Sequence, residues 1–219
     1  FYKCKDNYLL CSSPERFIKR EGSKISSQPI KGTAKRGSTV VEDEQLKSDL
    51  FNSEKERSEN VMIVDLVRND LSRIATKGSV KVDELFGIYT FPAVHQMIST
   101  ISCDVDAELK FTDILRALFP MGSMTGAPKI RAMEIINETE NFNRGLYSGS
   151  IGYILPNGDF DFNVVIRSIL YNSSSQSISI PVGSAITASC DPQLEYDECL
   201  LKAKALLELL QSTKTATVK

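Results

Sequence analysis

The fold is decided by residues 16–33, which read RFIKREGSKISSQPIKGT. Runs 16–19 and 24–28 are short and strand-like, and a glycine-bearing turn separates them, so they predict an antiparallel hairpin. This hairpin leads directly into residues 29–33. There the proline fixes the approach and the glycine lets backbone come close to a ligand, which suits the presentation of the Lys31 amine. The same pattern is also typical of a solvated charge in a loop.

Hairpin groups recur along the rest of the chain. Further strands are predicted at 8–11, 94–102, 148–155, 160–171 and 177–182. Helices are predicted at 42–76, which fits either one helix or two, and at 112–118, 128–140 and 192–210, with a frayed tail from Gln211. Long helices without a regular strand–helix–strand alternation predict an α+β fold, a layered and mostly antiparallel sheet flanked by helices.

Composition excludes several classes of function. The 219 residues are 42% hydrophobic and 25% charged, which is enough for one sizeable core, and we expect one domain. A net charge of -2, with no Lys/Arg-rich run and no tryptophan, argues against nucleic acid and favours a small-molecule ligand. Five scattered cysteines without a CxxC pair indicate reduced thiols and a cytoplasmic protein. No apolar run is long enough to span a membrane, so no membrane partner is expected.

Two pairs of glutamates have helical spacing. Glu56 and Glu59 are three residues apart, and so are Glu195 and Glu198, with Lys202 four residues further on the same face. With one histidine and no paired thiols in the chain, such carboxylates suit Mg²⁺ better than zinc. Solvated helix faces partnered by nearby lysines and arginines show the same pattern.

Three other residues are candidates for ligand contact. Arg167 follows an apolar run in a predicted strand, so its guanidinium needs a carboxylate partner, either internal or from a ligand. Gly183 breaks the last strand and offers backbone N–H groups to an anion, although a plain turn explains it too. His95 either orients a ligand or is a satisfied structural residue.

Seven motifs occur together in the order found in the chorismate-utilising enzymes, and the chain resembles that family from about Ser12 to Leu210. They are SPERF (13–17), PIKGT (29–33), ENVMIVDLVRND (59–70), FPAVH (91–95), GAPK (126–129), GSIGY (149–153) and EYDE (195–198). The resemblance implies antiparallel sheets flanked by helices around Mg²⁺-bound chorismate. Because members of the family are longer, we expect residues 1–210 to be the C-terminal part of a catalytic domain that lacks its N-terminal portion, followed by a tail at 211–219.

The resemblance also implies roles for individual residues. Magnesium would be held by carboxylates of two helices, principally Glu59 and Glu198, with Glu56 and Glu195 nearby. The substrate carboxylates would be held by Arg167, Lys202, Tyr153 and the backbone around Gly183 and Ser184. The pocket would be lined by Thr33, Thr125 and His95. Glu15 would act as the general acid and base where the C4 hydroxyl departs.

Lys31 distinguishes branches of the family. In anthranilate synthases the corresponding tetrapeptide resembles PIAG, and isochorismate and salicylate synthases also lack the lysine. The chain therefore resembles the aminodeoxychorismate synthase branch. That branch implies addition of lysine at C2 and then attack at C4 by ammonia, either free or made by a glutamine amidotransferase partner. The predicted product is 4-amino-4-deoxychorismate. The alternatives are direct amination at C2, as in anthranilate synthase, and a non-catalytic module that binds chorismate or a partner.

Overall fold

The computed structural model describes residues 1–188 and 190–212, and the chain forms two compact units. The larger unit comprises residues 15–143 and 150–164. The smaller unit comprises residues 1–14, 144–149 and the described residues from 165 to 212. A compact unit is not by itself a domain, so one domain over residues 1–210 stays a prediction.

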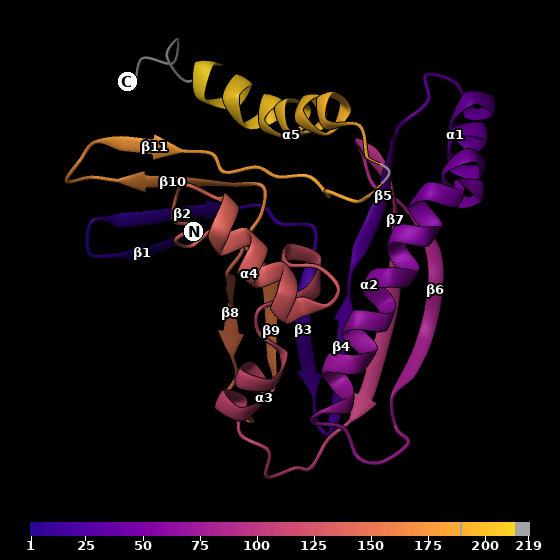
Figure 1. Ribbon diagram of the computed structural model, residues 1–219, viewed down its shortest axis with the longest axis vertical. Coiled ribbons are helices and arrows are strands. Elements are labelled where there is room, and N and C mark those ends of the chain that lie inside the picture. Colours follow the sequence, from indigo (N-terminus) through magenta and orange to yellow (C-terminus); the bar gives the residue numbers. More distant parts are fainter. Residues whose placement is uncertain (189, 213–219) are drawn as a thin grey trace. The chain divides into compact units, whose positions relative to one another are not determined.

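The larger unit is built on a seven-stranded sheet in which every pairing is antiparallel. Its strands are β3 (Arg16–Glu21), β4 (Lys24–Gln28), β5 (Ile30–Lys35), β6 (Lys81–Thr90), β7 (Val94–Asp104), β8 (Ser150–Ile154) and β9 (Phe160–Val164). They follow the order β5-β7-β4-β3-β9-β8, and β6 pairs with β7 (Figure 1). The predicted hairpin at 16–28 therefore lies in the interior of the sheet.

Four α-helices accompany this sheet. They are α1 (Val40–Asn52), α2 (Glu54–Ser72), α3 (Phe111–Leu118) and α4 (Lys129–Thr139), and a 3₁₀ turn, η1 (Gly122–Met124), precedes α4. The predicted helical stretch is two helices because Ser53 is extended and caps α2 by accepting the N–H of Glu56 at 3.4 Å. Figure 1 shows α2 running along the sheet, where it packs against β5 and β7. The helix buries Ile63, Val64 and Leu71, which recur at helical spacing.

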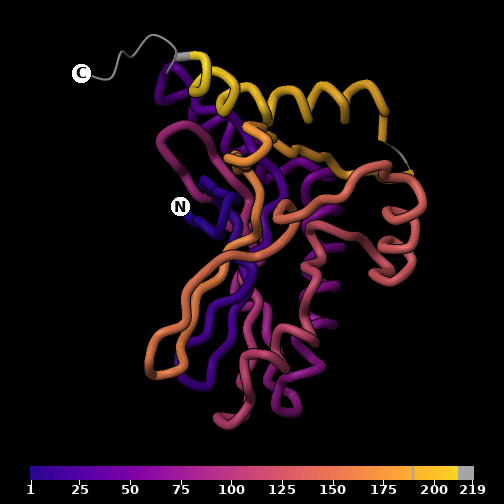
Figure 2. Tube along the Cα trace, turned by 90° about the vertical axis from the view of Figure 1, so that its left-hand side faces the viewer, coloured from indigo at the N-terminus to yellow at the C-terminus, as the bar shows by residue number. Residues whose placement is uncertain are grey.

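The described part of the smaller unit has a four-stranded sheet and one helix. Its strands are β1 (Tyr2–Cys4), β2 (Asn7–Cys11), β10 (Ser168–Asn172) and β11 (Ser177–Ser179), in the order β1-β2-β10-β11. The two hairpins lie side by side in Figure 2. The helix α5 (Pro192–Ser212) follows Asp191, whose carboxylate accepts the N–H groups of Gln193 at 2.8 Å and Leu194 at 3.2 Å.

The predicted α+β class with antiparallel sheets and flanking helices is confirmed. Strand boundaries were harder to predict. The expected strand 160–171 is two strands in different sheets, because the chain turns between them and Arg167 has a φ of 49°. β1, β5 and β6 were missed, and β6 is interrupted by register shifts that erase the two-residue period.

The remaining boundary differences are small. β11 ends at Ser179, and α5 includes Gln211 and Ser212 of the expected tail, while residues 213–219 lie outside the described part. Among the described residues no helix is long and apolar enough to cross a membrane.

A buried ion pair anchors α4, which has no buried residue of its own. Lys129 Nζ lies 2.6 Å from Asp70 Oδ2 and donates to the carbonyls of Leu118 at 3.1 Å and Pro120 at 2.7 Å. Burial raises the pKa of Asp70, and the Lys129 ammonium opposes that rise. The pair therefore ties the start of α4 to α2 and to the end of α3.

Lys129→Met should lower the free energy of unfolding by about 3 kcal/mol or more, because it leaves a buried carboxylate and two carbonyls without their donor. Lys129→Met combined with Asp70→Leu should cost less than the single change. Urea denaturation measures both, with Lys47→Met, at a half-exposed pair with Glu44 on α1, as the control. Equal losses in the single and double variants would contradict the anchoring role.

Candidate active site

Lys31 lies in a β-bulge. Ile30 pairs with Ile98 and Thr33 with Gln96, so β5 carries one residue more than β7 between these pairs. Gly32 within the bulge has a φ of 93°, a conformation that favours glycine. Bulges re-aim side chains and are common beside active sites. With 19% of its side chain exposed, Lys31 is not a solvated loop charge.

The carboxylates of α2 face this bulge. Glu56 and Glu59 begin the same helix face that buries Asn60 and Ile63. Lys31 Nζ lies 3.6 Å from Glu59 Oε2, and only 16% of the Glu59 side chain is exposed. A Cβ atom on Gly32 would lie 3.3 Å from Glu56 Oε2, so the bulge and the helix approach each other closely. The structure thus brings Lys31, Glu56 and Glu59 together.

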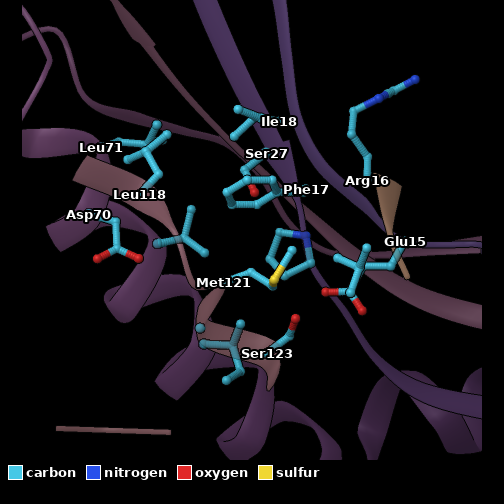
Figure 3. A pocket seen from close by; sticks show the side chains of 15 residues that line it. Glu15, Arg16, Phe17, Ile18, Ser27, Asp70, Leu71, Leu118, Met121 and Ser123 are labelled. Atoms are coloured by element: carbon cyan, nitrogen blue, oxygen red, sulfur yellow. The ribbon is translucent and has the colours of Figure 1, made fainter. Parts of the chain in front are cut away.

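Glu15 lines a narrow cavity in the same unit. The residue precedes β3 and is 6% exposed. Figure 3 shows its carboxylate on the same cavity as the Met121 and Ser123 side chains. Most of the wall is apolar, from residues such as Phe17 and Leu118. Carboxyl groups with apolar surroundings are commonly used as general acids.

His95 occupies a buried hydrogen-bonded network. It is 1% exposed, its Nε2 lies 3.0 Å from Asp43 Oδ1, and its Nδ1 lies 2.9 Å from Thr90 Oγ1. Arg36 binds the Asp43 carboxylate through two nitrogens at 2.8 Å. The Arg36 guanidinium, with the N–H of Gly37, holds the pKa of Asp43 well below its usual range. These contacts fit a structural histidine, and its place beside a ligand stays a prediction.

A second group forms within the smaller unit. Glu195, Glu198 and Lys202 share the inward face of α5, where Glu195 is 5% exposed. Lys202 Nζ lies 2.5 Å from Glu198 Oε1 and donates to the carbonyl of Gly183 at 2.9 Å. Gly183 approaches Tyr147 so closely that an added Cβ would lie 2.9 Å from the tyrosine hydroxyl.

The other predicted contact residues occupy varied positions. Arg167 is not in a strand, since it lies in the connection between β9 and β10 with a positive φ. Thr33 is exposed on β5, and Thr125 follows η1 and donates to the carbonyl of Met121 at 3.1 Å. Tyr153 is 58% exposed on the edge strand β8, and Ser184 lies in the connection before α5. Their roles toward a substrate stay predictions.

The carboxylates suit magnesium in their chemistry. In the described part of the chain, no three acidic, histidine or cysteine side chains gather as a metal-binding group. Each unit instead supplies two carboxylates from one helix face, Glu56 with Glu59 and Glu195 with Glu198. Mg²⁺ is commonly held by one or two protein carboxylates together with water and substrate oxygens. Such donor pairs fit a magnesium site.

Two polar clusters were not predicted from the sequence. They are Asp43 with Arg36, and Asp70 with Lys129. Asp70 and Lys129 are the last residues of the motifs at 59–70 and 126–129, and their membership of these motifs could have marked them as important. Asp43 had no such signal, because an acidic residue in the first turn of a helix is ordinary.

Comparison with known proteins decides the family. The sequence model of the family described as "chorismate binding enzyme" matches residues 1–208. The chain belongs to the chorismate binding enzyme family. The resemblance drawn from the seven motifs is therefore confirmed.

Among the relatives of this chorismate binding enzyme are two named aminodeoxychorismate synthases. A probable chloroplastic aminodeoxychorismate synthase of Oryza sativa subsp. japonica is 47% identical over 204 residues, which are 93% of this chain and 23% of the relative. Aminodeoxychorismate synthase component 1 of Salmonella typhimurium is 44% identical over 212 residues, covering 97% of this chain and 46% of the relative. The chain thus spans less than half the length of either relative.

A solved structure supports the same family. The crystal structure of anthranilate synthase component I from Streptococcus pneumoniae TIGR4 matches with a TM-score of 0.82 and 35% sequence identity. The match covers 93% of this chain and 44% of that one. The fold is therefore shared between branches of the family, and the branch must be argued from the site.

Asp43→Asn should destabilise the fold in a pH-dependent way. Because the pKa of Asp43 is lowered on folding, its contribution to stability is fully present above the unfolded pKa, about 4, and is lost as the pH falls through the folded value. The stability difference between wild type and variant should therefore be largest near neutral pH and shrink below about pH 4. Denaturation at several pH values measures it. Asp65→Asn, at an exposed pair with Arg68, is the control, and a pH-independent Asp43→Asn difference would contradict the assignment.

Proposed function

We propose that this chain carries the catalytic lysine for amination of chorismate at C4, which gives 4-amino-4-deoxychorismate. The observation that supports it most is the position of Lys31, an amine in a glycine bulge 3.6 Å from Glu59. The relatives from rice and Salmonella, both named aminodeoxychorismate synthase, support the same branch.

The proposed chemistry uses two allylic displacements. The neutral amine of Lys31 forms a bond to C2, both conjugated double bonds of the ring shift by one position, and the C4–O bond breaks while Glu15 protonates the hydroxyl, which leaves as water. Ammonia then bonds to C4, both double bonds shift back, and the C2–N bond breaks with its electron pair returning to Lys31. The Glu15 carboxylate takes the proton that the new amino group loses. Chorismate and ammonia thus give 4-amino-4-deoxychorismate and water.

The assignment of binding residues rests on their chemistry and on the family motifs that contain or adjoin them. We assign Mg²⁺ to Glu59 and Glu198, with Glu56 and Glu195 nearby, on the basis of their oxygen donors and their motifs. When bound, the ion would reduce the negative charge on a substrate carboxylate. The substrate carboxylates are assigned to Arg167, Lys202, Tyr153 and the backbone at Gly183 and Ser184, with Thr33, Thr125 and His95 lining the pocket.

The ammonia for this reaction would come from a partner protein or from solution. The Salmonella relative is named component 1, which supports a second component in that enzyme. For this chain we propose a glutamine amidotransferase subunit as that component. Free ammonium salts should replace it in an assay, since ammonia is the species consumed.

The proposal is tested by incubating the protein with chorismate, Mg²⁺ and ammonium, and separating the products by chromatography and mass. Lys31→Ala should abolish 4-amino-4-deoxychorismate formation, because it removes the nucleophile. Lys35→Ala, an exposed lysine on the same strand, is the matched control and should retain activity. Without ammonium, wild type should gain the mass of chorismate less water on the peptide that contains Lys31.

Three results would contradict this function. Anthranilate as the product would support the C2-aminating alternative. Chorismate binding without turnover would support a non-catalytic module. Wild-type product yield from Lys31→Ala, with no adduct on wild type, would remove the covalent step.

Glu59→Gln should raise the Mg²⁺ concentration needed for half-maximal turnover by about tenfold or more, because an amide is a weaker ligand than a carboxylate. Magnesium titration of the initial rate measures the change. Glu54→Gln, on the exposed first turn of the same helix, is the control and should titrate like wild type. An unchanged magnesium dependence in Glu59→Gln would exclude it from the ligand set.

A further inference from the structure

Ser99 on β7 and Asn60 on α2 form a buried hydrogen-bonded pair. They are 0% and 1% exposed, and Ser99 Oγ donates to Asn60 Oδ1 at 2.6 Å. The segments that carry the proposed catalytic residues adjoin this pair. Asn60 follows Glu59 in the helix, and Ser99 lies next to Ile98, which pairs with Ile30 at the start of the lysine strand.

Ser99 also binds the segment before Lys31 through its backbone. Its N–H donates to the carbonyl of Pro29 at 3.3 Å, two residues before Lys31. The backbone of this one residue therefore binds the segment that carries the amine, while its side chain binds the helix that carries the carboxylate. The regular ladder does not fix Lys31 and Gly32, because they lie in the bulge between the pairs Ile30–Ile98 and Thr33–Gln96.

A third contact orients the serine hydroxyl. The N–H of Phe86 donates to Ser99 Oγ at 3.1 Å, so the hydroxyl proton is directed to Asn60. Phe86 itself has a φ of 60°, and its ring lies 4.8 Å from the guanidinium carbon of Arg57 on α2. Backbone of this kind persists only where its surroundings determine it. The bulge of β6 is thus fitted to the same region of α2.

We propose that Ser99 and Asn60 are positioning residues that set the distance between Lys31 and the carboxylates of α2. This inference rests on the proposed function, because the distance matters for catalysis only if Lys31 is the nucleophile. The contacts of Ser99 and Asn60 do not depend on that function. A shift of about 1 Å in a catalytic group is enough to lower a rate strongly. The position of Asn60 is set through its Oδ1, since its Nδ2 has no hydrogen-bond partner among the described residues.

The test measures the reactivity of Lys31 without using turnover. Trace acetylation with acetic anhydride, followed by peptide mass spectrometry, gives the labelling rate of Lys31 relative to Lys47 in the same full chain. Ser99→Ala and Asn60→Leu should each raise this ratio by about fivefold, because each removes one hydrogen bond that holds the strand of Lys31 against α2. Ser102→Ala is the matched control, because it removes a buried hydroxyl of the same strand that donates instead to Asp83.

The double variant Ser99→Ala with Asn60→Leu separates positioning from stability. Replacing both partners by apolar groups should recover stability in urea denaturation. The Lys31 labelling ratio should stay raised, because nothing then fixes the helix against the strand. If the ratio returns to the wild-type value together with stability, or if Ser102→Ala raises it equally, the pair is only structural and the proposal is wrong.

A kinetic readout distinguishes failure of this inference from failure of the proposed function. If wild type makes 4-amino-4-deoxychorismate, Ser99→Ala should lower kcat much more than it raises KM for chorismate. A fall confined to KM would contradict positioning. If wild type shows no turnover, the proposed function fails, and the labelling ratio still decides the role of the pair.

Discussion

The close approach of the Gly32 bulge to α2 is the constraint on which the candidate site depends. A side chain at Gly32 would meet Leu50 and Glu56, so only glycine lets the strand come this near to the helix. That proximity has an electrostatic cost, because it places carboxylates in a partly buried space. Lys31 offsets the cost with a positive charge of its own. The amine and the acids are therefore parts of one arrangement.

The fold class and many of the helix and strand positions could be predicted from the sequence because they follow from local signals. The hairpin at 16–28 and the helix at 128–140 depend on turn glycines and on a proline at a helix start. The strand that carries Lys31 could not be predicted, since its pairing partners lie 59 to 68 residues away along the chain. Its bulge also removes the two-residue period by which strands are found.

In the candidate site, too, the features that follow from local spacing were predictable, and those that depend on tertiary packing were not. The spacing of Glu56 with Glu59, and of Glu195 with Glu198, fixed which side chains share a helix face, and the structure bears out those faces. The contacts of His95 with Asp43 and of Lys202 with Gly183 depend on tertiary packing, which spacing does not encode. The placement of Arg167 in a strand is the clearest error, because an apolar run before an arginine looks the same whether the chain continues or turns, while its role toward a substrate stays a prediction.

The partners of β3 have a consequence for how the chain is made. On one side it pairs with β4, its neighbour in sequence, and on the other with β9, where Arg16 binds Asp161 through contacts 145 residues apart. During synthesis the β3 edge of the β3–β4 hairpin stays unpaired until β9, near the end of the larger unit, has left the ribosome. Pairings of such long range form slowly and leave strand edges open to other chains meanwhile. Chaperone binding to nascent chains would therefore be concentrated on this edge.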